Sequence, residues 1–227
     1  SPLFGSFLHY TVPAAKSNRK SRRFSRLAKR AKIGYTVNIM SNFCFLEDLM
    51  DEQKTTGTLY IVATPIGNSR DMSERGREIL STADIIAAED TRRSVVLLNK
   101  LGIRGNSLSA NHKFNEYGKA KWFIEQLQQG KNIAVITAAG TPCISDPGNE
   151  LIRAAVENGI RVVGVPGCCA AVNALSISGF DLSTFFFYGF FPRETADRRR
   201  VLMFIHTADT EIYAFYESPK RIMSVID

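Results

Sequence analysis

The sequence predicts an α/β protein built on a parallel sheet. From Gly57 onward, short and continuously apolar segments alternate with amphipathic segments of helical spacing, and Gly or Pro residues separate them. Strands that are apolar along their whole length are typical of parallel sheets covered by helices on both faces. Hydrophobic residues make up 44% of the 227 residues and charged residues 22%, a composition that excludes collagen, coiled coils and wholesale disorder.

Six segments are expected to be strands. The first, TLYIVA, is β-branched and apolar and runs into the turn residues TPIGN. DIIAA, NIAVIT and RVVGV are equally short and apolar. FFFYGFF is expected to be a buried strand because of its aromatic residues, and EIYAFY is expected to be another strand. The expected strands are 58–63, 84–88, 132–137, 161–165, 185–191 and 211–216.

Helices are expected between these strands. Ser73 can cap the first helix, and Gly102, Gly130 and Gly159 stand where three others should end. The expected helices are 73–81, 92–100, 116–129, 149–158, 170–178 and 194–206. The last of them and its two flanking strands begin a second α/β unit, and the sequence stops at Asp227 inside a further helix.

The net charge of +7 is confined to the start of the chain. Nine Lys and Arg residues fall in 1–49 against two acids, whereas 50–227 holds 20 residues of each sign. So basic a segment has too few apolar residues to offset chain entropy. It reads either as an organellar transit peptide or as a basic tail, the latter including read-through from upstream of an initiator at Met50. We therefore expect a basic leader at 1–49 that is disordered or not native to the domain, an α/β domain at 50–167, and the start of a second, incomplete α/β domain at 168–227.

The cysteine and histidine spacings predict no metal site and no structural disulfide framework. None of these residues forms a C-x-x-C pair or a zinc or haem pattern. They are Cys44, Cys143, Cys168, Cys169, His9, His112 and His206. No apolar run approaches the 18 residues of a membrane span. We expect a soluble protein of a reducing compartment.

Four loops of unusual composition leave the expected strands at one edge of the sheet. They are TPIGN, AEDTR, AAGTPCISDPG and VPGCCAA. In an open α/β sheet, ligands bind outside the carboxyl ends of the strands, and Gly and Pro let the backbone approach a ligand closely. None of the loops fits GxxxxGK[ST] or GxGxxG, so the fingerprints of P-loop NTPases and dinucleotide-binding folds are missing.

Taken together, these segments resemble one known family. Six segments follow one another between Gly57 and Ile222: TLYIVATPIGN, IIAAEDTR, AAGTPCISDPG, VPGCCAAVNALSISG, FFFYGFFPR and FYESPKR. In their order and amino-acid sequence, these segments resemble the ribosomal RNA small subunit methyltransferase I family, within the tetrapyrrole methylase superfamily. The resemblance implies methyl transfer from S-adenosylmethionine to the ribose 2′-hydroxyl of a cytidine in small-subunit rRNA. It also implies two α/β domains with the cofactor cleft between them, the second truncated here, and a cytoplasmic homodimer (organellar if the leader is a transit peptide).

The resemblance also implies a set of site residues. Cofactor contacts are implied at Pro65, Ile66, Gly67, Ala139, Gly140, Thr141, Ile144, Cys169, Ala170 and Glu217. A general base must remove the hydroxyl proton, and we rank Glu89 and Asp90 first, with Asp146 also a candidate. The alternative for Asp90 is a helix N-cap, and His112 is a further candidate base or a solvated loop residue. The basic residues expected to contact RNA phosphates are Arg92, Arg193, Lys220 and Arg221.

Two departures from the family pattern leave alternatives open. Ala138 stands where the family usually has Asp, and Cys168-Cys169 replaces a pair of small residues. One alternative is therefore a truncated or degenerate member that binds cofactor or RNA without turnover. A tetrapyrrole C-methyltransferase is a further alternative, disfavoured because AEDTR and FYESPKR resemble the rRNA branch.

Overall fold

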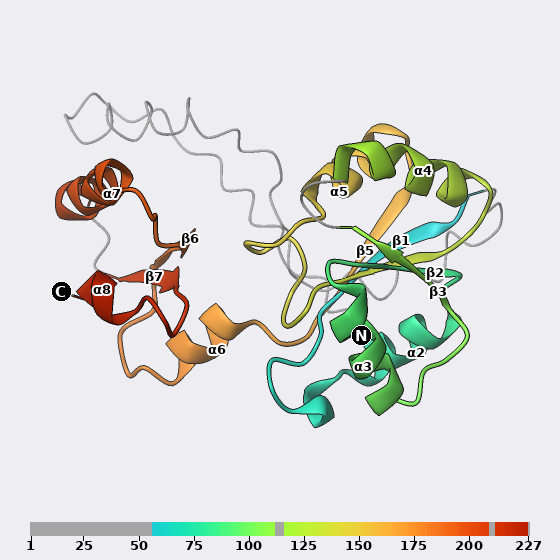
Figure 1. Ribbon diagram of the computed structural model, residues 1–227, viewed down its shortest axis with the longest axis horizontal. Coiled ribbons are helices and arrows are strands. Elements are labelled where there is room, and N and C mark those ends of the chain that lie inside the picture. The colour runs from blue at the N-terminus through green and yellow to red at the C-terminus, as the bar shows by residue number, and fades with distance from the viewer. Residues whose placement is uncertain (1–55, 112–115, 209–211, 227) are drawn as a thin grey trace, which may run out of the picture. The chain divides into compact units, whose positions relative to one another are not determined.

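A five-stranded parallel sheet organises the larger part of the chain that the computed structural model describes, residues 56–111, 116–208 and 212–226 (Figure 1). The basic leader predicted at 1–49 lies outside these residues, as does His112. The strand order is β3-β2-β4-β1-β5. The strands are β1 (Thr58–Val62), β2 (Ile85–Ala88), β3 (Ser107–Ala110), β4 (Ile133–Ile136) and β5 (Arg161–Val165). The predicted α/β class is confirmed.

Helices cover both faces of this sheet, as the apolar strands require. They are η2 (Ser69–Asp71), α2 (Glu74–Thr82), α3 (Thr91–Lys100), α4 (Glu116–Gln128) and α5 (Asn149–Glu157). Leu80 of α2 and Leu98 of α3 pack with Ile86 on one face. Phe123 of α4 and Leu151 of α5 pack with the other face (Figure 1).

The central strands β1 and β4 lie side by side, yet their connections leave in opposite directions. The chain passes from β1 through α2 on one face and from β4 through α5 on the other. Such a reversal opens a crevice at the carboxyl ends of the two strands, which is where open α/β sheets bind ligands. The predicted cap is also confirmed: the Ser73 hydroxyl accepts a hydrogen bond from the Gly76 N–H at 3.1 Å and begins α2.

Strand β3 was not expected from the sequence. Its residues SLSA carry one large apolar side chain and lie half exposed at the edge of the sheet, so neither an apolar run nor a clean alternation marks them. Pairing with β2 over the whole of its length is what makes it a strand.

A second, two-stranded parallel sheet follows, formed by β6 (Phe186–Phe190) and β7 (Tyr213–Tyr216). Its helices are α6 (Ala170–Ser176), α7 (Thr195–Thr207) and α8 (Met223–Ile226). The strand prediction is confirmed, but the expected burial of 185–191 is wrong: Phe190 is 54% exposed, and only Phe191 is buried among its large apolar side chains. Two strands and α7 supply too little surface to cover every ring. The domain boundaries at 50–167 and 168–227 remain a prediction.

Candidate functional site

Two of the predicted loops are tied together where β1 and β4 end. Thr64, the second residue after β1, exchanges two backbone hydrogen bonds with Gly140, the N–H of each donating to the carbonyl of the other at 2.8 and 3.0 Å. The buried Thr64 hydroxyl also donates to the Thr137 carbonyl at 3.3 Å. These bonds hold the TPIGN turn against the AAGTPCISDPG loop at the carboxyl edge of the sheet.

The AAGTPCISDPG loop has a strained backbone. Cys143 and Ser145 have φ angles of 68° and 66°, in the left-handed region that non-glycine residues rarely adopt. Strain of this kind persists only where the surroundings hold it, and it is concentrated at functional sites. Gly189 of β6 lies close to this loop, because a Cβ atom added to it would come within 2.9 Å of the Ser145 hydroxyl.

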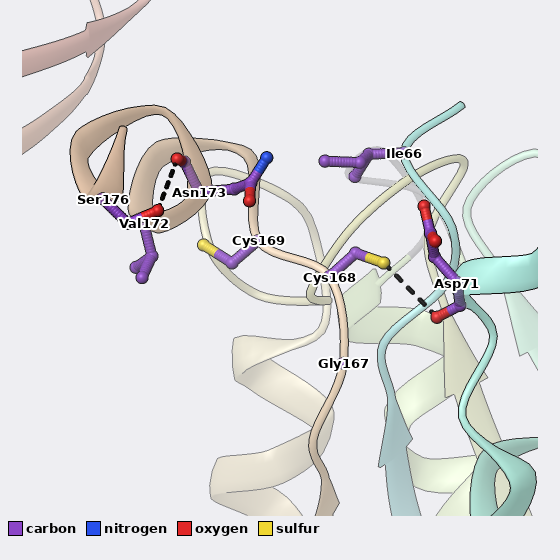
Figure 2. Close-up of a pocket in the computed structure, with 8 residues that line it drawn as sticks. All are labelled: Ile66, Asp71, Gly167, Cys168, Cys169, Val172, Asn173 and Ser176. Carbon is purple, nitrogen blue, oxygen red and sulfur yellow. Dashed lines mark hydrogen bonds between the residues drawn. The ribbon is translucent and has the colours of Figure 1, made fainter. Parts of the chain in front are cut away.

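A pocket of about 400 Å³ opens beside these loops (Figure 2). One side comes from the loop after β1, and the other from the Pro-Gly turn after β5 and the start of α6. Its lining residues are Ile66, Asp71, Gly167, Cys168, Cys169, Val172, Asn173 and Ser176. The Cys168 thiol lies 3.5 Å from the Asp71 carbonyl and links the two sides (Figure 2). The volume falls within the range of small-molecule sites.

The lining of the pocket suits a small ligand with both apolar and polar parts. Ile66 and Val172 provide apolar surface, while Asn173, Ser176 and Asp71 provide polar atoms. Asp71 is exposed, so its carboxylate can also face a cationic group. Among the described residues, no group of three or more His, Cys, Asp or Glu side chains could hold a metal ion.

Two of the cofactor contacts implied by the family resemblance line this pocket directly, namely Ile66 and Cys169. Gly140 and Thr141 lie next to residues that line the pocket. The Thr141 hydroxyl donates to the Cys168 carbonyl at 2.9 Å, and a Cβ on Gly140 would lie 3.5 Å from Ile66. The other implied contacts are not among the lining residues. They are Pro65, Gly67, Ala139, Ile144, Ala170 and Glu217. Asp71, Asn173 and Ser176 were missed because they lie on short helices beyond the turns that the motifs mark.

Two of the three candidate catalytic carboxylates meet at one hydroxyl. Thr137, the residue after β4, has its Oγ1 2.7 Å from Glu89 Oε2 and 3.0 Å from Asp146 Oδ2. Glu89 Oε2 also accepts from the Ala138 N–H at 3.4 Å. Burial raises the pKa of Asp146 above its ordinary value, the Thr137 hydrogen bond opposes this shift, and the charge of Glu89 adds to it. Both carboxyl groups are half buried.

Asp90 serves as the N-cap of α3, which was the alternative considered for it. Its Oδ1 accepts from the backbone N–H groups of Arg92 and Arg93 at 2.9 and 3.3 Å. These bonds satisfy two of the four free N–H groups that begin any helix. We therefore do not retain Asp90 as a candidate base.

Glu217 is committed to an ion pair. Its side chain is 7% exposed, and its two oxygens each accept from Arg221, at 2.8 Å from Nε and 2.8 Å from Nη2. Desolvation would raise the pKa of Glu217, but hydrogen bonds from the Ser218 N–H and from Arg221, together with the Arg221 charge, lower it below the ordinary value. The pair offsets the charge of both side chains, while the cofactor contact at Glu217 and the RNA contact at Arg221 stay predictions.

The other three basic residues predicted to meet RNA are Arg92, Arg193 and Lys220, and their side chains are exposed. No side-chain ion pair involves them among the described residues, so each is available to a phosphate. A search of the same residues finds no helix long and apolar enough to cross a membrane.

Comparison with known proteins gives a consistent family assignment. The model of the tetrapyrrole (corrin/porphyrin) methylases matches residues 58–227. A protein of Haemophilus influenzae named ribosomal RNA small subunit methyltransferase I is 48% identical over 76% of this chain and 60% of its own length. Its namesake in Escherichia coli O157:H7 is 46% identical over 75% of this chain and 59% of its own length. The chain thus spans about 60% of the length of these relatives.

Among solved structures, the crystal structure of uroporphyrin-III-C-methyltransferase from Thermus thermophilus is 20% identical. It has a TM-score of 0.45 and matches over 59% of this chain and 60% of its own.

Proposed function

The chain belongs to the tetrapyrrole methylase family, and we propose that it uses S-adenosylmethionine to methylate small-subunit ribosomal RNA on the ribose 2′-hydroxyl of a cytidine. The observation that carries the proposal is the pocket between the loops that follow β1 and β5, together with relatives 46–48% identical that are named for methylation of this RNA. The cofactor would supply an electrophilic methyl group at the carboxyl edge of the sheet.

Different residues along this edge would bind the cofactor and the RNA. Ile66, Cys169 and Asn173 would hold the cofactor, and the Thr64–Gly140 bonds would fix the loop behind it. Arg92, Arg193 and Lys220 would hold RNA phosphates, an arrangement that a nearly neutral body needs in order to bind a polyanion.

Glu89 is the base that we propose. It leaves the carboxyl end of β2, and its carboxylate accepts hydrogen bonds only from Thr137 and Ala138 among the described residues. A base positioned beside the acceptor hydroxyl contributes about 10²–10⁴-fold in rate. We rank Glu89 above Asp90, because Asp90 Oδ1 accepts from the backbone N–H groups that begin α3.

A transfer assay tests the proposal. The intact chain is incubated with methyl-labelled S-adenosylmethionine and small ribosomal subunits that lack the modification, and the RNA is digested to nucleosides. We expect the label in 2′-O-methylcytidine. Calorimetric binding of the cofactor without incorporation would favour the alternative of a family member that binds without turnover, a possibility raised by Ala138 at a position where the family usually has Asp.

We also propose that the active form is a homodimer. The exposed apolar residues of β6 and α7 support this, because Phe190 is 54% and Met203 65% exposed in the single chain. Light scattering of the purified chain measures its mass in solution, and a monomer at micromolar concentration would contradict the proposal.

A further inference from the structure

A row of polar side chains crosses the sheet one residue beyond the ends of β3, β2 and β4. The ladder continues past the strands, because the Asn111 N–H donates to the Ala88 carbonyl at 2.8 Å and the Glu89 N–H to the Ile136 carbonyl at 3.3 Å. Ala88 is in register with Ala110 and with Ile136. Asn111, Glu89 and Thr137 therefore stand level on three adjacent strands, about 4.8 Å apart. We call Asn111, Glu89 and Thr137, with Asp146, the polar row.

The side chains of the polar row leave the sheet on one face. Residues two apart in a strand point the same way, so Glu89 follows Ala87, and Thr137 follows Val135. Both Ala87 and Val135 belong to the core cluster beneath α4 and α5. Asn111 follows Ser109, whose hydroxyl bonds to Lys119 of α4 at 2.8 Å. Asn111, Glu89 and Thr137 thus share the face that α4 and α5 cover, and Asp146 joins them through Thr137.

The two carboxyl groups of the row cannot both be satisfied by Thr137 alone. A hydroxyl has one proton to donate, yet Thr137 Oγ1 lies within hydrogen-bond distance of both Glu89 and Asp146. The Thr137 proton can go to Glu89 Oε2 at 2.7 Å or to Asp146 Oδ2 at 3.0 Å, so one of the two contacts is always left without it.

Asn111 provides independent evidence of a ligand. Its side chain is 2% exposed, and neither its amide nitrogen nor its amide oxygen has a hydrogen-bond partner among the described residues. A buried polar group left unpaired is costly, and such groups are few in native proteins. Asn111 offers both a donor and an acceptor beside the carboxylate of Glu89.

We propose that the polar row binds an uncharged donor–acceptor group of the substrate nucleotide, with Asn111 as a binding residue and Thr137 as a positioning residue. This inference rests on the proposed function and deepens it. A phosphate is excluded, because the carboxylate would repel it. A sugar hydroxyl or the amino edge of a cytosine fits, since each can donate to Glu89 and pair with the Asn111 amide.

Binding of the intact chain to three short fluorescent RNAs tests the proposal. The first carries a single cytidine among adenosines, the second has 2′-deoxycytidine at that place, and the third has the 2-pyrimidinone nucleoside, which lacks the amino group. We expect the wild-type chain to bind one of the altered RNAs about tenfold more weakly than the first, because a hydrogen bond to a charged acceptor is lost. The arm that responds identifies the sugar or the base as the group bound.

Variants separate the row from general effects on folding. Asn111→Ala and Thr137→Val should abolish the discrimination, whereas Thr137→Ser, which retains a hydroxyl, should preserve it. Ser94→Ala is the matched control, since Ser94 also has a buried hydroxyl without a partner among the described residues but lies in α3. Its discrimination should equal that of the wild type.

Three results would overturn the inference. The first is equal binding of all three RNAs, and the second is discrimination that survives in both Asn111→Ala and Thr137→Val. The third is saturable Mg²⁺ binding, measured by calorimetry on the intact chain, that disappears in Glu89→Gln and would make the row a cation site. Cofactor binding and label transfer by the wild-type chain are measured separately from these results, so failure here is distinguishable from failure of the proposed function.

Discussion

Replacing Gly140 by alanine tests the role of the loop contact that joins β1 to β4. Gly140 has a φ of 90°, where an alanine is strained. Its new Cβ would meet nothing closer than Ile66 Cγ2 at 3.5 Å and the Cys168 carbonyl at 3.7 Å, both ordinary contacts. The cost is therefore conformational rather than steric, about 1–2 kcal/mol for an L-residue in the left-handed region.

The backbone can avoid this strain only by giving up the two hydrogen bonds to Thr64, which lie at 2.8 and 3.0 Å. Two such bonds contribute about 1–3 kcal/mol together, so relaxation offers little saving and the loss of stability stays near 1–2 kcal/mol. Because Gly140 lies against Ile66 of the pocket, we also expect weaker cofactor binding.

Urea unfolding followed by circular dichroism measures the change, and calorimetry measures the cofactor affinity. Gly67→Ala is the matched control: Gly67 has no positive φ, and its Cβ would meet no atom within 4 Å. We expect that control to change the free energy of unfolding by less than about 0.5 kcal/mol. Equal stability of the two variants would refute the reasoning.

Three further predictions concern stability and the assignment of carboxylates. Asp90→Ala should lower the free energy of unfolding by about 1 kcal/mol, because the α3 cap is lost. The rate of methyl transfer should stay unchanged. A large fall in that rate at full cofactor occupancy would favour Asp90 as the base. Asp146→Asn should abolish a component of the pH dependence of stability. Because folding raises the pKa of Asp146 above its ordinary 3.8, wild-type stability falls as the pH rises from 3.8 through the folded-state pKa. Thermal denaturation across this pH range measures the effect, and a variant with the wild-type pH profile would contradict the shift. Phe123→Ala should cost about 3–5 kcal/mol because the ring is 0% exposed in the core, whereas Trp122→Ala, 39% exposed on the same helix, should cost much less in the same urea titration.

Much of the fold could be predicted because its strands are short, apolar and separated by Gly or Pro. β1, β2, β4 and β5 were expected within a residue or two of their observed bounds. β3 escaped prediction because an edge strand of sequence SLSA owes its conformation to pairing with β2 rather than to its own side chains.

The candidate site was predictable only in part, because motifs mark turns and not the residues that surround them. The family resemblance pointed to Ile66 and Cys169, which line the pocket, but not to Asn173 or Ser176 on α6. The helix cap at Asp90 was foreseen as an alternative, whereas the ion pair of Glu217 with Arg221 was not, since an i,i+4 pair depends on local geometry.

The polar groups at the two edges of the sheet differ in kind, although both edges hold buried atoms without a partner. At the amino edge, Asn132 accepts from the Thr58 N–H at 3.0 Å and donates its own N–H to Asp84 at 2.7 Å, while Thr58 Oγ1 and Asn106 Oδ1 have no partner among the described residues. At the carboxyl edge, Asn111 is buried without a partner among the described residues, and two carboxyl groups compete for the hydroxyl of Thr137. A protein selected for stability alone would pair these groups or replace them with apolar residues. Their retention at the edge where parallel sheets bind ligands is what a substrate that completes the hydrogen bonds would explain.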